Sequence, residues 1–92
     1  MTAYVIAELE ITDAEAFKAY GPLVRASVEK YGGGYAVRGA TVTALDGEPP
    51  KRVAILTFET GDAARRWYQS PEYTAARAIR LNATKSRMFI VE

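Results

Sequence analysis

The sequence predicts an α+β fold in which four antiparallel strands form a sheet and two helical regions lie on one face. Three observations support this. Four apolar runs have the length of strands, two stretches with helical periodicity separate the outer runs from the inner ones, and a turn rich in glycine and proline joins the inner pair. The order is therefore β-α-β-β-α-β, the ferredoxin-like arrangement. A chain of 92 residues has the length of one domain, so we expect a single domain over residues 1–92.

The first strand and the first helical region occupy residues 3–31. The run AYVIAELEI predicts a strand, and Thr12 and Glu15 after it have the spacing of a capping box at a helix start. Apolar side chains then recur at three- and four-residue steps, at Phe17, Tyr20, Val24, Val28 and Tyr31. Gly21-Pro22 interrupts this face. Because proline lacks a backbone donor and disfavours helical geometry at the preceding residue, we expect a kink or two short helices.

Three glycines follow this helix, in the stretch YGGGYAVRG at residues 31–39. Gly32 comes just after the last periodic residue, where a left-handed helix cap favours glycine. A phosphate-binding loop needs the opposite order, with a strand first, then glycines, then the N-terminus of a helix. The glycines therefore indicate a helix stop and not a phosphate site.

The two inner strands form a predicted hairpin. Residues 35–45 make the second strand, in which Gly39 indicates a bulge or a close backbone approach. Residues 46–51, with the sequence DGEPPK, predict the turn, and residues 52–59 the third strand.

A second helical region separates the third strand from the last. Asp62 is the expected N-cap of a helix that carries Ala64, Trp67 and Tyr68. Ser70-Pro71 predicts a restart, with serine as the cap and proline at the first helical position. This second helix should run to near Leu81 with Ala75, Ala76 and Ile79 inward, and residues 86–92 should form the last strand.

Composition excludes several function classes. The chain contains no cysteine and no histidine. This removes disulfides, the usual zinc, iron–sulfur and haem sites, Ser-His-Asp triads and cysteine nucleophiles. We therefore expect no cofactor and no metal. A net charge of +1 gives no electrostatic reason to expect nucleic acid. No signal peptide and no apolar run of membrane-spanning length is visible, so the expected location is the cytoplasm, without membrane contact.

The strand patterns also predict a homodimer. Helices on one face leave the other face of the sheet open, and that face should be polar if it meets water. In the third strand, however, Val53 and Ile55 lie on one face, and Ala54, Leu56 and Phe58 on the other. The last strand shows the same apolar character on both sides. An exposed apolar sheet of this kind is a partner site, and two copies packed face to face would cover it.

Four stretches resemble a known family: AYVIAELEITD, YGGGYAVRGA, PPKRVAILTFE and ARRWYQSPEYTAARAIR. They are similar to the family called domain of unknown function 1330, which is assigned to the dimeric α+β barrel superfamily. The resemblance covers almost the whole chain and implies that fold and a dimer, but no established reaction. The wider superfamily includes cofactor-independent monooxygenases, haem-degrading enzymes, dismutases and cyclase-like enzymes. Their catalytic residues, often histidines, have no counterpart here, so none is carried over.

Arg38 is the first candidate for a ligand contact. It alternates with Ala36 and Ala40, whose small side chains leave room around it. A guanidinium there could bind a carboxylate or phosphate through two parallel hydrogen bonds. The favoured alternative is structural: if the hairpin closes regularly about residues 48 and 49, Arg38 lies near Glu59 and pairs with it.

An aromatic group surrounds the predicted break in the second helical region. It contains Trp67, Tyr68 and Tyr73, and with Tyr20 and Tyr31 it could line a cleft for a flat organic ligand. Core packing is the favoured alternative. Arg80 follows Ile79 on a largely apolar helix and is a candidate partner for an anion. Glu8 and Glu10 share one strand face, either as an acid–base pair or as residues that pair with nearby arginines.

These candidates support two functions from different classes. The first is a homodimer that binds or transforms a small aromatic or carboxylate-bearing metabolite without a metal, with Tyr20, Arg38, Trp67, Tyr68 and Arg80 as ligand-binding residues. The alternative is a non-catalytic dimer that acts by interaction alone, and the sequence does not decide whether the protein is an enzyme. Nucleic-acid binding is less favoured, because the third strand RVAILTFE lacks the aromatic pattern of the RNA recognition motif.

Overall fold

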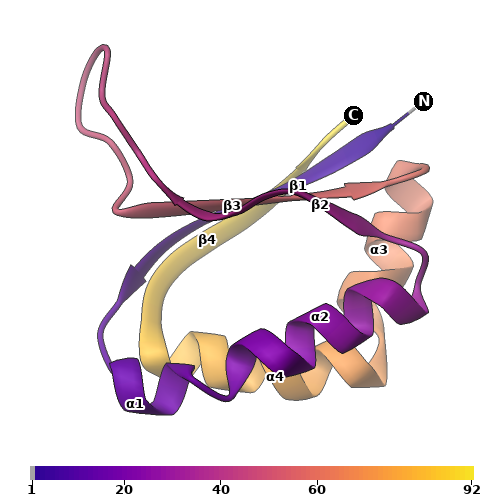
Figure 1. Ribbon diagram of the computed structural model, residues 1–92. Helices are drawn as coiled ribbons and strands as arrows, with labels where there is room; N and C mark the ends of the chain where they lie inside the picture. The colour runs from indigo at the N-terminus through magenta and orange to yellow at the C-terminus, as the bar shows by residue number, and fades with distance from the viewer. Residues whose placement is uncertain (1) are drawn as a thin grey trace.

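The computed structural model describes residues 2–92, without the side chain of Ala40, as one four-stranded antiparallel sheet with all helices on one face (Figure 1). The strands are β1 (Ala3–Ile11), β2 (Gly34–Thr41), β3 (Arg52–Phe58) and β4 (Thr84–Val91), in the spatial order β2-β3-β1-β4. The helices are α1 (Ala14–Phe17), α2 (Tyr20–Lys30), α3 (Gly61–Gln69) and α4 (Pro71–Ala83). This confirms the ferredoxin-like arrangement, with each predicted helical region divided into two helices.

The core lies between the sheet and the helices. Alternate residues of β1 point toward the helices and are buried, as expected for a strand with a side-chain period of two. Val5 is paired with Leu56 of β3 on one side and with Ile90 of β4 on the other. The largest fully buried side chains above them are those of Trp67 and Tyr73. The second helical region therefore supplies most of the aromatic surface that the sheet buries.

The first helical region begins and breaks at different residues from those predicted. The N-cap is Asp13, whose side chain accepts a hydrogen bond from the backbone N of Ala16. Thr12, the expected cap, instead donates its backbone N–H to the carbonyl of Ala83 at 2.8 Å. Two short helices form, as expected, but the break lies at residues 18–19. Pro22 falls in the first turn of α2, where its missing N–H leaves no intrahelical bond unmade.

The prediction for Gly32 is confirmed. Its φ angle is +77°, in the left-handed region that favours glycine. The backbone N of Gly32 donates to the carbonyl of Glu29 at 3.2 Å, and the N of Gly33 donates to that of Val28 at 2.9 Å. This pair of bonds is the Schellman motif, which satisfies the last carbonyls of α2 before the chain turns into β2.

The hairpin between β2 and β3 contains the predicted bulge. Gly39 has a φ angle of +52°, and the pairing of β2 with β3 shifts register between Val37 and Ala40. β2 ends at Thr41, earlier than the predicted Leu45, and residues 42–51 form a loop that extends away from the sheet (Figure 1). The side chain of Leu45 is almost fully exposed, so this end of the predicted strand does not pack against the sheet.

The second helical region has one N-cap that differs from the prediction and one that agrees. The N-cap of α3 is Thr60, whose side chain accepts from the N of Ala63, and Asp62 lies in the first turn. Ser70 caps α4 as predicted, with Pro71 at the start of the helix.

The end of α4 also extends beyond the prediction. The helix runs past Leu81 to Ala83, and β4 begins at once with Thr84. Ala76 is buried and Ile79 is half-buried, but Ala75, which was expected inward, is exposed. The chain therefore passes from helix to strand without a loop at the position where Thr12 is anchored.

The sheet face opposite the helices carries a group of apolar side chains, and no helix of residues 2–92 covers it. We call it the open sheet face; it carries Tyr4, Ile6, Val53, Ile55, Phe89 and Val91, which the strand register places together. Tyr4 is 42% exposed, Phe89 39% and Val91 46%. Both faces of the sheet are therefore apolar, as the strand patterns predicted, while the helices cover only one (Figure 1).

Candidate functional site

Four of the five predicted site residues meet at Tyr73, a fully buried residue in the first turns of α4. The ring centroid of Tyr73 lies 4.2 Å from that of Trp67 and 5.5 Å from that of Tyr68. Its hydroxyl lies 2.9 Å from the hydroxyl of Tyr20 and accepts a hydrogen bond from Nε of Arg80 at 3.0 Å. The aromatic group expected from the sequence is thus assembled around Tyr73, and Arg80 belongs to it.

Arg80 is a buried cation whose hydrogen-bond partners are neutral. It is 3% exposed, and besides Tyr73 it contacts Ser86, to which Nη1 donates at 2.8 Å. No carboxylate within residues 2–92 lies at ion-pair distance from it. Buried arginines are normally paired with an acid, because taking a charge out of water is costly. The interior between α4 and the sheet therefore carries an uncompensated positive charge.

Tyr20 and Tyr73, the two tyrosines of this group whose hydroxyls lie together, stay protonated. Burial raises the pKa of Tyr20 well above its usual range, and it also raises the pKa of Tyr73. The positive charge of Arg80 acts in the opposite direction on both pKa values but does not cancel the effect of burial. Both side chains are consequently hydroxyl donors and acceptors at ordinary pH, and neither is a phenolate base.

Trp67 is primarily a packing residue. It is fully buried, and its indole Nε1 donates to Oγ of Ser27 at 3.0 Å, while Ser27 donates to the carbonyl of Val24 at 2.7 Å. Trp67 and Tyr68 also line an apolar pocket of about 320 Å³ between α3 and β4. Core packing, the favoured alternative for this aromatic group, therefore describes Trp67, while half-buried Tyr68 faces a pocket as well.

A second pocket, of about 200 Å³, lies between the first helical region and the β2–β3 half of the sheet. Its aromatic walls are Phe17, Tyr20 and Tyr35, and its charged residues are Arg25, Arg38 and Arg52, with no acidic residue in the lining. We call it the arginine pocket. Tyr20 and Phe17 stack with ring centroids 5.1 Å apart. The predicted residues Tyr20 and Arg38 thus share a pocket, while Arg25, Arg52, Phe17 and Tyr35 were not predicted to line a site.

Arg38 does not form the expected ion pair. The hairpin pairs Gly34 with Thr57 and Val37 with Ile55, so Glu59 lies beyond the end of β3 and far along the strand from Arg38. The bulge and the long loop cause this difference in pairing. They move the point about which the hairpin closes away from residues 48 and 49, which the prediction assumed. The guanidinium of Arg38 instead lies over the ring of Tyr35, 4.7 Å from its centroid.

The space around Arg38 is only partly described. Ala36 is exposed, and the side chain of Ala40, its other expected small neighbour, lies outside the described part. The predicted role of Ala36 and Ala40 in leaving room for a ligand therefore stays a prediction.

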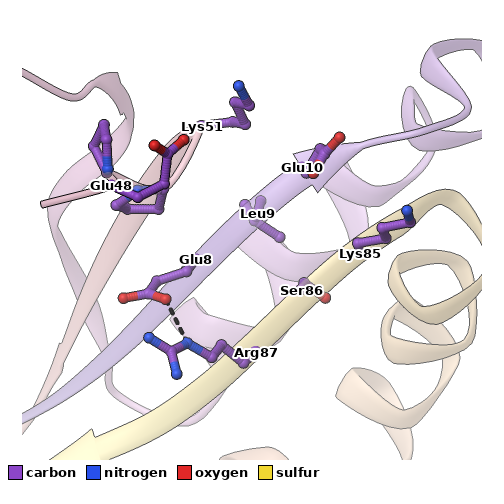
Figure 2. A pocket seen from close by; sticks show the side chains of 10 residues that line it. Glu8, Leu9, Glu10, Glu48, Lys51, Lys85, Ser86 and Arg87 are labelled. Atoms are coloured by element: carbon purple, nitrogen blue, oxygen red, sulfur yellow. Dashed lines mark hydrogen bonds and ion pairs between the residues drawn. The ribbon is translucent and has the colours of Figure 1, made fainter.

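Glu8 and Glu10 lie on the open sheet face, at the end near the long loop, and line a pocket of about 360 Å³ (Figure 2). Figure 2 shows Glu8 and Arg87 pointing toward one another, and Nε of Arg87 donates to Oε1 of Glu8. Glu10 is opposite Lys85 in the β1–β4 register. Each of the two glutamates on β1 is thus opposite a basic residue of β4. This arrangement agrees with the structural reading of the two glutamates and not with an acid–base pair.

Metal ligands do not gather in the described part of the chain: no group of three or more Asp, Glu, His or Cys side chains could hold an ion there. The polar groups that do converge are hydroxyls and guanidiniums. Both suit a ligand with anionic or carbonyl oxygens, because guanidiniums only donate and hydroxyls can donate.

The fold and these pockets define a small ferredoxin-like α+β protein with a cationic, aromatic pocket between helices and sheet. Residues 2–92 match the family described as a domain of unknown function, DUF1330, and the chain therefore belongs to that family. This confirms the resemblance seen in the sequence. No curated protein matches the chain.

Solved structures share the fold at low sequence identity. The RPA0582 protein of unknown function from Rhodopseudomonas palustris is 22% identical with a TM-score of 0.80, over 98% of this chain and 80% of that one. A dimeric ferredoxin-like protein of unknown function from Jannaschia sp. CCS1 is 10% identical with a TM-score of 0.78, over 100% and 99%. SnoaB, a cofactor-independent oxygenase from Streptomyces nogalater, is 16% identical with a TM-score of 0.72, over 99% and 91%. Within residues 2–92, each helix is too short or too polar to span a membrane.

Proposed function

We propose that this protein is a homodimer that binds a small aromatic or carboxylate-bearing anion in the arginine pocket of each subunit. One observation carries the proposal: the pocket combines three arginines with three aromatic side chains and has no acid in its lining. A guanidinium can hold a carboxylate through two parallel hydrogen bonds, and aromatic walls accommodate a flat ring. The uncompensated charge of Arg80 behind Tyr20 favours the same sign of ligand.

The size of the pocket narrows the ligand class. A volume of about 200 Å³ is below the range of roughly 300–1,000 Å³ that is common for drug-sized ligands. A compound with one ring and one anionic group fits this space better than a polycyclic one. The proposed ligand is therefore a single-ring carboxylate or phenolate.

Chemistry without a metal or cofactor is compatible with this site. SnoaB, described as a cofactor-independent oxygenase, has the same fold, and this supports such chemistry as a use of the scaffold. In the present chain, which has no histidine and no cysteine, tyrosine hydroxyls and guanidiniums would have to orient the substrate. Binding is the part of the function that the pocket supports directly, and turnover is a further step to be measured.

Dimerisation is supported by the open sheet face. Its large apolar side chains are partly exposed in one chain, and a second copy placed against it would bury them. The Jannaschia protein, described as dimeric, has the same fold. Native mass spectrometry tests the assembly: we expect a mass twice that of the 10.1 kDa chain. A monomer at micromolar concentration would contradict the dimer and would favour a different partner for this face.

Ligand binding is tested with salicylate, a fluorescent single-ring carboxylate, and with benzyl alcohol as its uncharged comparison. We expect salicylate to bind more tightly, and Arg38→Gln to weaken its binding roughly tenfold or more, because a hydrogen bond to a charged group is lost. Arg66→Gln is the matched control, since Arg66 is an exposed arginine on α3 outside the pocket lining. Absence of salicylate binding, or equal losses in both variants, would contradict the proposal and favour a non-catalytic interaction dimer.

A further inference from the structure

The arginines of the arginine pocket come from two facing walls. Arg25 lies on α2, on the helix side of the pocket, whereas Arg38 and Arg52 lie on β2 and β3, on the sheet side. The lining contains no acidic residue, and no ion pair within residues 2–92 involves any of the three arginines. The pocket lining therefore carries three positive charges that the described side chains do not neutralise.

On the sheet side, the two guanidiniums lie against other residues of the pocket lining. That of Arg38 lies over the ring of Tyr35, with Cζ 4.7 Å from the ring centroid. Nη2 of Arg52 donates to the carbonyl of Gly39 at 3.4 Å, where β2 has its bulge. Because Gly39 directly follows Arg38 in the chain, the bulge brings both cations to the same part of the sheet wall.

On the helix side, Arg25 acts on the same tyrosine as Arg38. Burial raises the pKa of Tyr35, while the positive charges of Arg38 and Arg25 both act to lower this pKa. Since charge–charge interactions weaken with distance, both guanidiniums are close to the Tyr35 hydroxyl. Glu29, one helical turn after Arg25, also acts on Tyr35 but is not at ion-pair distance from Arg25. Arg25 can therefore bind a ligand that lies against Tyr35.

A ligand with one negative charge would match only part of this positive charge. A carboxylate that accepts two parallel hydrogen bonds from guanidinium groups on one wall leaves the opposite wall without an anionic partner. We propose that the ligand is a single-ring dicarboxylate, with one carboxylate bound by Arg38 and Arg52 at the sheet and the other by Arg25 at the helix. The inference rests on the proposed function and narrows its ligand from an anion to a dianion.

The ring of such a ligand would lie among the aromatic walls. Phe17 and Tyr20 come from the first helical region and Tyr35 from β2, so aromatic surface is present on both sides of the pocket. Each guanidinium has five N–H donors, and the single hydrogen bond from Arg52 to Gly39 uses few of those available within residues 2–92. Most donors can therefore exchange water for a ligand oxygen.

Isothermal titration calorimetry with isophthalate tests this inference, with 3-carbamoylbenzoate as the matched ligand. The two compounds have nearly the same shape, but an amide replaces one carboxylate in the second, which removes one negative charge. We expect isophthalate to bind roughly tenfold or more tightly, because a hydrogen bond between two charged groups is stronger than one to a neutral amide.

Arg25→Gln should remove most of this preference. It should weaken isophthalate binding roughly tenfold but change the affinity for 3-carbamoylbenzoate less than about threefold, because the single carboxylate of that compound stays on the sheet wall. Arg52→Gln should weaken the binding of both ligands. Arg66→Gln, on the exposed face of α3 outside the pocket lining, is the control and should change neither affinity. All three arginines are exposed, and circular dichroism with thermal unfolding shows that each variant keeps the fold.

The outcomes separate this inference from the proposed function. If the wild-type protein binds neither salicylate nor isophthalate, the proposed function is wrong and the inference falls with it. If it binds salicylate, but isophthalate no more tightly than 3-carbamoylbenzoate, the proposed function stands and the dianion is overturned. If isophthalate is preferred, but Arg25→Gln weakens both ligands equally or neither of them, the assignment of the second carboxylate to Arg25 is overturned.

Discussion

Gly33 offers a sharp test of how α2 passes into β2. It follows the left-handed Gly32, and its own φ angle lies outside the region that favours glycine, so an alanine could adopt its backbone conformation. The obstacle is steric. A Cβ at this position would lie 2.6 Å from Cε1 and 2.8 Å from Cζ of Phe58, and 3.0 Å from Cγ1 of Val28. Both neighbours are buried, Phe58 at 2% and Val28 at 0% exposure. Neither the ring of Phe58 nor the side chain of Val28 can therefore move into solvent.

The expected cost of Gly33→Ala follows from this crowding. Forcing an extra carbon into a packed core costs typically about 1–3 kcal/mol. We expect the upper part of that range, because two contacts are shorter than any relaxed approach and the backbone N of Gly33 is bonded to the carbonyl of Val28. For a domain of this size, a loss of about 2–3 kcal/mol lowers the melting temperature by roughly 8–24 °C.

Urea denaturation measures the effect, with the fluorescence of Trp67 as the signal. Trp67 is the single tryptophan of the chain, and its ring centroid is 5.3 Å from that of Phe58, so it reports on the region that the substitution crowds. The midpoint should fall while the slope stays constant. Both proteins must be compared at one chain concentration, because the stability of the proposed dimer would depend on it.

Gly21→Ala is the matched control for this experiment. A Cβ on Gly21 meets nothing within 4 Å, and the residue lies in the first turn of α2. Alanine is the better helix former, but a Cβ on the residue before Pro22 is disfavoured in helical geometry, and these two effects oppose each other. This variant should therefore change the free energy of unfolding by less than about 1 kcal/mol. A loss below about 0.5 kcal/mol in Gly33→Ala, or equal losses in both variants, would refute the packing argument.

Three further predictions concern a buried hydrogen bond, a titrating ion pair and the open sheet face. Ser27→Ala should lower the free energy of unfolding by about 1–3 kcal/mol, because the indole N–H of Trp67 loses its buried acceptor; an unchanged urea midpoint would contradict this. The hydrogen bond from Lys30, followed by smaller contributions, lowers the pKa of Glu72 from 4.5 to about 2, so ionised Glu72 stabilises the fold above the ordinary carboxyl range. That stabilisation should disappear as pH falls from about 4.5 toward 2, and Glu72→Gln should remove this part of the pH dependence in thermal melts; an identical profile would show that the pair is too exposed to contribute. Ile55→Lys should convert the proposed dimer to a monomer in native mass spectrometry, and a persistent dimer would mean that the interface lies elsewhere.

The elements that could be predicted are those with strong local signals. Gly32 after the last apolar position of the helix, Ser70-Pro71 at the restart and Gly39 within a strand all acted as expected, because each imposes its own backbone geometry. The caps at Thr12 and Asp62 were predicted wrongly. In both places two capping residues stand close together, and Thr12 is held by Ala83, a contact from the far end of the chain that no local pattern contains.

The predictions for the candidate site were also partly right and partly wrong. Tyr20, Trp67, Tyr68 and Arg80 were identified by residue type, and the structure brings all four to Tyr73. The pair of Arg38 with Glu59 was wrong, because it assumed a regular hairpin where the structure has a bulge and a long loop. A shift of register moves every partner along the strand, and its size depends on how the loop packs.

The amino-acid sequence by itself determined the order of strands and helices, the absence of thiol and imidazole chemistry, and the apolar character of both sheet faces. These properties depend on residue types and on their spacing over a few turns, which hydrophobic periodicity records. Only the tertiary structure decided that three arginines from α2, β2 and β3 surround one pocket, and that Arg80 is buried without a carboxylate partner among residues 2–92. These are distances between segments far apart in the chain, and they are set by strand register and helix packing, which the sum of many weak contacts determines.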